Sequence, residues 1–179
     1  MRDEKLKRML FIALLMGLAA VLTMLVAVPI GIIPGAYVHP GDAIIFVAAY
    51  LFGPAAGAIV GGIGGAIADA AVGAYIYIIP TLIVKAVMGT LAGLALKKTD
   101  IRKSWLSGCL RMLLTTVSMI LGYGLYEGFA FGWGLAAASV PFNVLQAVVS
   151  SVLATFTLVF IMRIPWLASL RDDEGGIGR

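Results

Sequence analysis

Long apolar runs alternate along the chain with short breaks that are polar or rich in glycine and proline. A spanning helix needs about 20 apolar residues, and most of the runs come close to that length. We therefore predict an all-α fold, one domain over residues 1–179 that forms an integral membrane six-helix bundle. The predicted spans are residues 9–32, 41–53, 55–73, 80–96, 105–128 and 140–163. The second is short, so it must tilt little, begin inside the preceding loop or be covered by its neighbours.

Prolines, glycines and charges mark the breaks between these spans. Breaks are expected at residues 33–41, 53–54, 73–80, 97–104 and 129–139, and a polar tail at residues 171–179. Residues 97–104 contain the internal charge cluster. The apolar run that begins at Met9 after a basic start is also typical of a signal peptide. It is longer than a signal-peptide core, and the rest of the chain is equally apolar, so we interpret it as the first span.

The composition supports a membrane protein. Hydrophobic residues make up 61% of the chain and charged residues 12%, against about 45–50% and 25% in soluble domains. The mean hydropathy is +1.05. Such a chain could not cover its apolar surface in water, which excludes soluble enzymes, nucleic-acid-binding proteins and disulfide scaffolds. Cys109 is the single cysteine and His39 the single histidine, so we expect no internal disulfide, no metal site and no cofactor.

The basic residues predict the topology. Of the 13 lysines and arginines, all except Lys85 and Arg111 fall at the termini, near the end of the sixth span or in residues 97–104. Loops rich in Lys and Arg stay in the cytoplasm. Both termini are therefore predicted to be cytoplasmic, and the net charge of +4 needs no nucleic acid to explain it.

Small residues recur on two of the predicted helices. Glycines at positions 57, 61, 65 and 73, with Asp69 between them, follow a four-residue spacing that forms one helical stripe. Small residues allow helix backbones to approach closely in a membrane, so this helix is expected at the centre of the bundle. The first span has Ala13, Gly17 and Ala20 on one face, which could meet another helix of the chain or a partner.

The polar residues of the spans converge at one depth. The predicted topology places four charged residues in the outer leaflet, namely Asp42, Asp69, Lys85 and Glu127. Charges in membrane spans are costly and are functional candidates. Further polar and aromatic residues share that level or the outer loops, and these are Tyr37, His39, Tyr75, Tyr77, Tyr123, Tyr126, Trp133, Asn143 and Gln146. Alternatively, the aromatic residues form an interfacial belt and the charges pair with one another, for instance Lys85 with Asp69.

The pattern indicates a polar, aromatic-lined pocket that opens to the outside above an apolar, sealed inner half. A channel would need polar groups along its whole depth, and a self-sufficient transporter would be expected to show inverted repeats of broken helices. The sequence lacks Gly-x-x-x-x-Gly-Lys-Ser/Thr, so uphill transport would need another subunit to supply energy.

Four motifs carry a resemblance to a known family. They are Gly35-Ala-Tyr37-Val-His39-Pro-Gly41-Asp42-Ala, Gly53-Pro54-x-x-Gly57, Gly61-Gly62-Ile-Gly64-x-Ala66-x-Ala68-Asp69 and Pro80-Thr81-x-x-x-Lys85-x-x-x-Gly89. With Glu127 and Pro141-Phe142-Asn143-x-x-Gln146, they resemble the S-components of energy-coupling-factor (ECF) vitamin transporters, riboflavin type. His39 departs from the asparagine expected in many relatives.

The resemblance implies a mechanism and partners. An S-component binds a vitamin near the outer surface of a prokaryotic cell membrane, docks on a membrane T-component driven by two cytoplasmic ATPases, and topples to carry the ligand inward. Ala13 and Gly17 would form the docking face, and residues 33–41 the lid.

The ligand is expected to be a flat heterocycle such as riboflavin, pyridoxine or a thiamine-precursor pyrimidine, because aromatic residues with mixed donors and acceptors suit one. Three acids against one lysine disfavour a strongly anionic ligand. The expected binding residues are Tyr37, His39, Asp42, Asp69, Tyr75, Tyr77, Lys85, Tyr123, Glu127, Asn143 and Gln146. Two alternatives remain: a solitary transporter or structural membrane subunit, and a membrane enzyme using Glu127 with His39 or Asp69 as acid and base. The second lacks a catalytic motif such as His-Glu-x-x-His.

Overall fold

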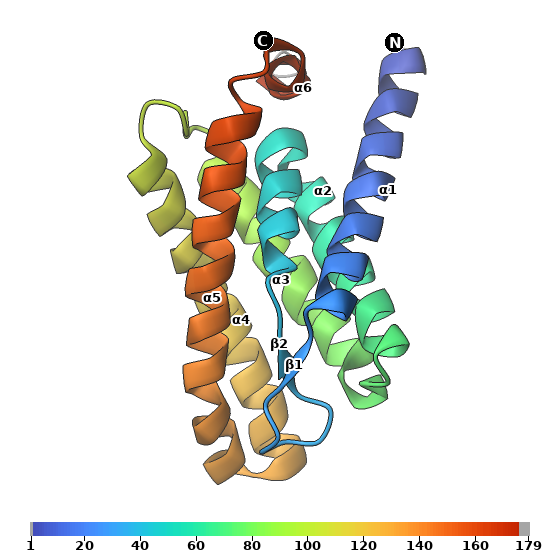
Figure 1. Ribbon diagram of the computed structural model, residues 1–179, viewed down its shortest axis with the longest axis vertical. Coiled ribbons are helices and arrows are strands. Elements are labelled where there is room, and N and C mark those ends of the chain that lie inside the picture. The colour runs from blue at the N-terminus through green and yellow to red at the C-terminus, as the bar shows by residue number, and fades with distance from the viewer. Residues whose placement is uncertain (1, 176–179) are drawn as a thin grey trace.

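The computed structural model describes residues 2–175 of the chain, with the side chains of residues 5–171 (Figure 1). The expected all-helical fold is confirmed. The helices are α1 (Arg2–Leu25), α2 (Asp42–Ala71), α3 (Ile78–Leu96), α4 (Trp105–Phe131), α5 (Trp133–Ile161) and α6 (Pro165–Gly175), with a short 3-10 helix η1 (Tyr75–Tyr77). Strands β1 (Val28–Pro29) and β2 (Tyr37–Val38) pair antiparallel as a small hairpin between α1 and α2.

Helix α2 doubles back on itself at Gly53. That residue has φ 79° and ψ −172°, which is not helical, and Pro54 begins the second arm. A Cβ placed on Gly57 would lie 2.9 Å from the Cβ of Ala49, whereas a continuous helix separates residues eight apart by about 12 Å. The first arm (residues 42–52) and the second arm (residues 54–71) therefore run antiparallel, at the two places where separate spans were predicted.

Five helices of the described residues are long and apolar enough to cross a membrane, and α2 is one of them. The predicted spans at 41–53 and 55–73 are its two arms. Figure 1 shows the start of α1 and helix α6 at the same end of the bundle, as an even number of crossings requires. That this end faces the cytoplasm stays a prediction.

Two predicted boundaries were wrong. The first span ends at Leu25 rather than residue 32, because the following residues enter the hairpin. The loop expected at 129–139 is almost entirely helical: α4 continues to Phe131, α5 begins at Trp133, and Gly132 alone turns the chain. Pro141, which lies inside the predicted span 140–163, is inside α5. The small apolar residues between Trp133 and Pro141 favour helix, and this outweighs the proline.

Helix α6 was not predicted, and it overlaps the expected polar tail, of which residues 176–179 lie outside the described part. Its Arg171 holds it against the bundle. The guanidinium lies 3.9 Å from the centre of the Tyr50 ring, hydrogen-bonds to the Tyr50 hydroxyl, and donates to the carbonyls of Leu96 and Lys97. Arg171 thereby joins the ends of the first arm of α2 and of α3.

The glycine stripe packs the second arm of α2 closely against α3. The central position expected for this arm belongs instead to the first arm, in which residues 42–52 are buried except Ile44. A Cβ on Gly61 would lie 2.6 Å from the carbonyl oxygen of Lys85, and one on Gly65 would lie 2.7 Å from Cγ2 of Thr81. Gly57 and Gly89 face each other at the next turn. The two helices are therefore antiparallel with a register in which each turn of the stripe meets one turn of α3, and no larger side chain fits between them.

Candidate functional site

A cavity with an empty volume of about 590 Å³, part of it open to solvent, lies between the hairpin and helices α2 to α5. Ten of the eleven predicted binding residues line it: Tyr37, His39, Asp42, Asp69, Tyr77, Lys85, Tyr123, Glu127, Asn143 and Gln146. Tyr75 does not: it is 70% exposed, whereas Tyr77 of the same short helix η1 is buried. The convergence of the polar residues on one place, expected from their depth, is therefore found.

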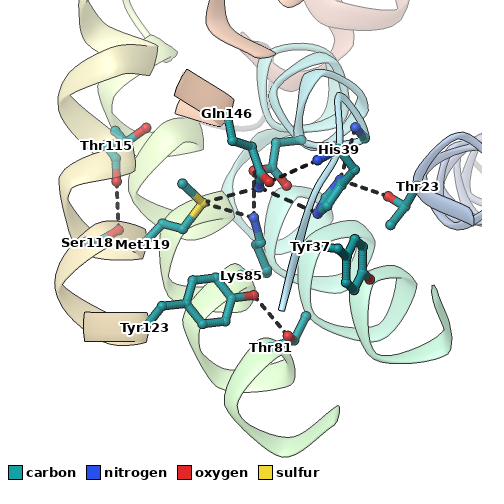
Figure 2. A network of polar contacts seen from close by, with 12 residues as sticks. Thr23, Tyr37, His39, Thr81, Lys85, Thr115, Ser118, Met119, Tyr123 and Gln146 are labelled. Atoms are coloured by element: carbon teal, nitrogen blue, oxygen red, sulfur yellow. Dashed lines mark hydrogen bonds and ion pairs between the residues drawn. The ribbon is translucent and has the colours of Figure 1, made fainter. Parts of the chain in front are cut away.

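An ion pair between Lys85 and Asp42 forms the centre of the site (Figure 2). Lys85 Nζ lies 2.5 Å from Asp42 Oδ2, and Gln146 Nε2 donates to the same oxygen at 2.8 Å. Nζ also lies 2.9 Å from the Met119 sulfur. Both ionic side chains are almost completely buried, so each depends on the other to remain charged.

The suggested pairing of Lys85 with Asp69 was wrong. The register of the α2 arms explains why. Lys85 lies opposite Gly61 on the second arm, and a helical rise of 1.5 Å per residue puts Asp69 about 12 Å further along that arm. Asp42 begins the first arm, in which Ile45 is the residue level with Gly61, so it is less than a turn away along the axis.

His39, the residue that follows β2, connects the hairpin to the helices by hydrogen bonds. Its Nδ1 accepts a hydrogen bond from the Gly41 N–H at 3.2 Å and lies 3.1 Å from Thr23 Oγ1. Its backbone N–H donates to Gln146 Oε1 at 3.0 Å. Burial lowers the pKa of His39 to about 4, opposed by the Asp42 carboxylate and assisted by the Lys85 cation. The imidazole is thus neutral near pH 7, with Nδ1 accepting from the Gly41 N–H and Nε2 lying 3.5 Å from Gln146 Nε2.

Tyr37, in strand β2 of the hairpin, contacts Asp69 on the second arm of α2. Its hydroxyl donates to Asp69 Oδ1 at 2.5 Å. Burial and the neighbouring Asp69 carboxylate raise the pKa of Tyr37, so the phenol remains a donor at every physiological pH. The hairpin is therefore attached to the cavity wall by Tyr37 on one side and by His39 on the other.

Glu127 stands at the aromatic side of the cavity. Its Oε1 accepts from the Tyr77 hydroxyl at 3.1 Å, and its Oε2 accepts from the Ser139 hydroxyl. The rings of Tyr77 and Tyr123 meet edge to face with centroids 6.1 Å apart. The Tyr123 hydroxyl pairs with Thr81 Oγ1 at 2.9 Å. These contacts hold the aromatic rings in fixed positions.

Sequence reasoning missed four residues that complete the site. Thr81 is one helical turn before Lys85, and Met119 one turn before Tyr123, so their spacing could have revealed both. Thr23 was hidden in the first apolar run. Ser139 was hidden because we expected a loop there.

The inner half is also less apolar than predicted. Helices α4 and α5 also carry buried hydroxyl groups beyond those that line the cavity, with Thr116 on α4 and Ser150 on α5 among them. We expected that half to be apolar and sealed.

The expected docking residues lie on the outer side of α1. Ala13 and Gly17 are exposed, and no heavy atom lies within 4 Å of where a Cβ on Gly17 would be. Ala20, by contrast, is buried against the bundle.

Helices long and apolar enough to span a membrane thus surround a polar, aromatic cavity behind a short hairpin. Residues 4–163 match the family of ECF-type riboflavin transporter S components, and the chain belongs to this family of membrane transport proteins. The resemblance found in the sequence is thereby confirmed.

Two relatives are similar to the chain, one a named transporter that agrees with this assignment and one an uncharacterised protein. The chain is 32% identical over 154 residues to the thiamine precursor transporter HmpT of Lactococcus lactis subsp. cremoris (strain MG1363), covering 86% of this chain and 87% of HmpT. It is 36% identical over 128 residues to an uncharacterised protein from the gap 3′ region of Pyrococcus woesei, covering 72% of this chain and 83% of that protein.

Proposed function

We propose that this chain is the high-affinity substrate-binding subunit of an ECF-type importer, and that it captures a B-vitamin or vitamin precursor at the outer membrane face. The observation that carries the proposal is the cavity behind the hairpin, where charged, amide and aromatic side chains from six elements converge. Cavities that bind small molecules combine apolar and aromatic walls with a few placed polar groups. The ligand class is a flat heterocycle such as riboflavin, pyridoxine or a thiamine-precursor pyrimidine, and HmpT is named for the last kind.

Delivery of the ligand is proposed to require partners. The chain would sit in the plasma membrane of a prokaryote with both termini in the cytoplasm, and would act with a membrane T-component and two cytoplasmic ATPase subunits. Membership of the S-component family supports this, as does the absence of a nucleotide-binding motif from the sequence. Ala13 and Gly17 on the exposed side of α1 are proposed as the docking face.

The first test is native mass spectrometry of the full chain, purified in detergent from cells grown in vitamin-rich medium. A stoichiometric small molecule of vitamin size is expected, and its mass and fragmentation identify it. The variant Lys85→Ala, which leaves Asp42 without its cation, is expected to lose the molecule. A chain that stays empty, and also fails to bind any member of a panel of B-vitamins and precursors, would contradict the capture function.

A further inference from the structure

The three buried carboxylates of the cavity differ in how far their oxygens are occupied. Both oxygens of Glu127 accept hydrogen bonds, from Tyr77 and from Ser139. Asp42 accepts both of its bonds on Oδ2, from Lys85 and Gln146, and its Oδ1 is buried without a partner. Asp69 accepts one bond on Oδ1, from Tyr37, and its Oδ2 is likewise buried without a partner within hydrogen-bond distance, although the Thr81 hydroxyl also interacts with this carboxyl group.

Asp42 and Asp69 differ in whether a neighbouring cation compensates their charge. The ammonium of Lys85 lies 2.5 Å from Asp42 and compensates it. Among the side chains of residues 5–171, no lysine or arginine forms an ion pair with Asp69, which is 3% exposed. A buried carboxylate without a cation is costly, by several kcal/mol or more, unless a proton or a ligand supplies the missing charge.

Native proteins leave few buried polar atoms without a hydrogen-bond partner. An unpaired polar atom beside a cavity therefore indicates which kind of ligand group, donor or acceptor, would complete its hydrogen bonding. A carboxylate oxygen accepts and cannot donate, so the ligand must present hydrogen-bond donors to both Asp42 and Asp69. A ligand edge of carbonyls and unprotonated ring nitrogens would place lone pairs against these oxygens. Where Asp69 is ionised, the partner group at Asp69 must also carry the positive charge.

We infer that Asp69 is the charge partner of the ligand, and that the ligand is a small aromatic nitrogen heterocycle with at least two donor groups. One donor group is directed at Asp69 Oδ2 and consists of a protonatable nitrogen that belongs to, or is adjacent to, an amino group. A second donor group reaches Asp42 Oδ1. Tyr77 and Tyr123 supply the aromatic wall for the ring. The inference rests on the proposed function. It narrows the ligand from any flat heterocycle to an aminopyrimidine-like compound or another protonatable, donor-rich ring.

The experiment compares probes that differ in one donor, by calorimetric titration of the detergent-purified full chain. The first probe is 4-amino-5-hydroxymethyl-2-methylpyrimidine. The second is its 4-oxo counterpart, in which a carbonyl acceptor replaces the amino donor. We expect the amino probe to bind at least about 10- to 100-fold more tightly, because a hydrogen bond to a charged group is worth about 1.5–3 kcal/mol. Riboflavin, whose ring edge is mostly acceptors, is expected to bind less tightly than the amino probe.

The variant Asp69→Asn is expected to weaken binding of the amino probe by about 10- to 100-fold. It keeps an oxygen for the Tyr37 hydroxyl and removes an uncompensated buried charge. Its melting temperature without ligand should therefore equal or exceed that of the wild type, which a purely structural role for Asp69 would not allow. Asp100→Asn is the matched control, because Asp100 lies in the loop between α3 and α4, remote from the cavity, and should leave the affinity unchanged.

Two results would overturn the inference while the capture function stands. One is equal or tighter binding of the 4-oxo probe or of riboflavin, which would mean that Asp69 is protonated and donates. The other is unchanged affinity in Asp69→Asn, or copurification of a ligand that has no donor edge. If no probe binds and no ligand copurifies, the capture function fails as well.

Discussion

At the residue scale, His39 is the group whose titration has the clearest consequence. It faces Asp42, Lys85 and Thr23, and burial lowers its pKa to about 4 from the ordinary 6.5. Between these two values the unfolded chain binds a proton that the folded chain does not. The contribution of His39 to the free energy of unfolding is therefore expected to be constant above pH 6.5 and to fall below it, by about 1–3 kcal/mol as the pH approaches 4.

Thermal unfolding in detergent between pH 4 and 8 measures this dependence. The control is His39→Asn, since an asparagine oxygen can accept the hydrogen bond of the Gly41 N–H but does not titrate. The variant is expected to lose the part of the slope between pH 6.5 and 4. An identical slope in both proteins would assign the effect to other groups.

The residue identities of the site were largely predictable, whereas their pairing was not. Lys85, Asp69 and Glu127 stand out in the sequence because charges are rare in apolar spans, and their position within a span gives their depth. That Lys85 meets Asp42 depends on the offset between the two arms of α2, and this offset follows from a turn at one glycine. Ser139 could not be placed without the helical start of α5.

At the element scale, the turn at Gly53 decides the architecture of the site. Its φ of 79° with ψ of −172° belongs to a region that is almost exclusive to glycine. Gly53→Ala is expected to lower the free energy of unfolding by about 1–3 kcal/mol and to weaken ligand binding, because the turn sets the offset of Asp42 from Lys85. Gly134→Ala, at a helical glycine where a Cβ meets no atom within 4 Å, is the matched control.

Thermal unfolding and ligand titration of both variants, purified in the same detergent, measure the two effects. A Gly53→Ala protein as stable as Gly134→Ala would mean that the turn tolerates a side chain, which would remove the glycine as the cause of the reversal.

The elements themselves were predicted unevenly. Apolar runs and the Gly53-Pro54 break located both arms of α2, since glycine and proline act locally. The start of α5 was missed because residues 129–139 were expected to form a loop; Pro141 lies in the helix interior, where packing must continue the helix past the hydrogen bond that the proline removes. Helix α6 could not be foreseen because it depends on Arg171 reaching Tyr50, a contact between residues that are far apart in the sequence.

At the scale of the whole molecule, the binding site and the proposed docking face are on different parts of the bundle. In the most apolar stretch of α1, 17% of the residues are buried, whereas 67% are buried in that of α2. The site depends mainly on α2 to α5 and the hairpin, and α1 contributes Ala19 and Thr23 to its lining. The outer side of α1, with Ala13 and Gly17, can therefore change without rearranging the cavity.

Because of this separation, Gly17→Leu is expected to abolish assembly with the T-component while ligand binding stays within about twofold of the wild type. A Cβ there meets no atom within 4 Å and Gly17 is exposed, so folding is expected to be unaffected, but a leucine prevents the close backbone approach that small residues allow between membrane helices. The measurement is copurification of the T-component and ATPases of the same organism, coexpressed with a tagged chain. Gly124→Leu on α4, where a Cβ likewise meets no atom within 4 Å, is the matched control and should assemble normally. Equal copurification of the two variants would place the docking surface elsewhere and leave the outer side of α1 to the lipid.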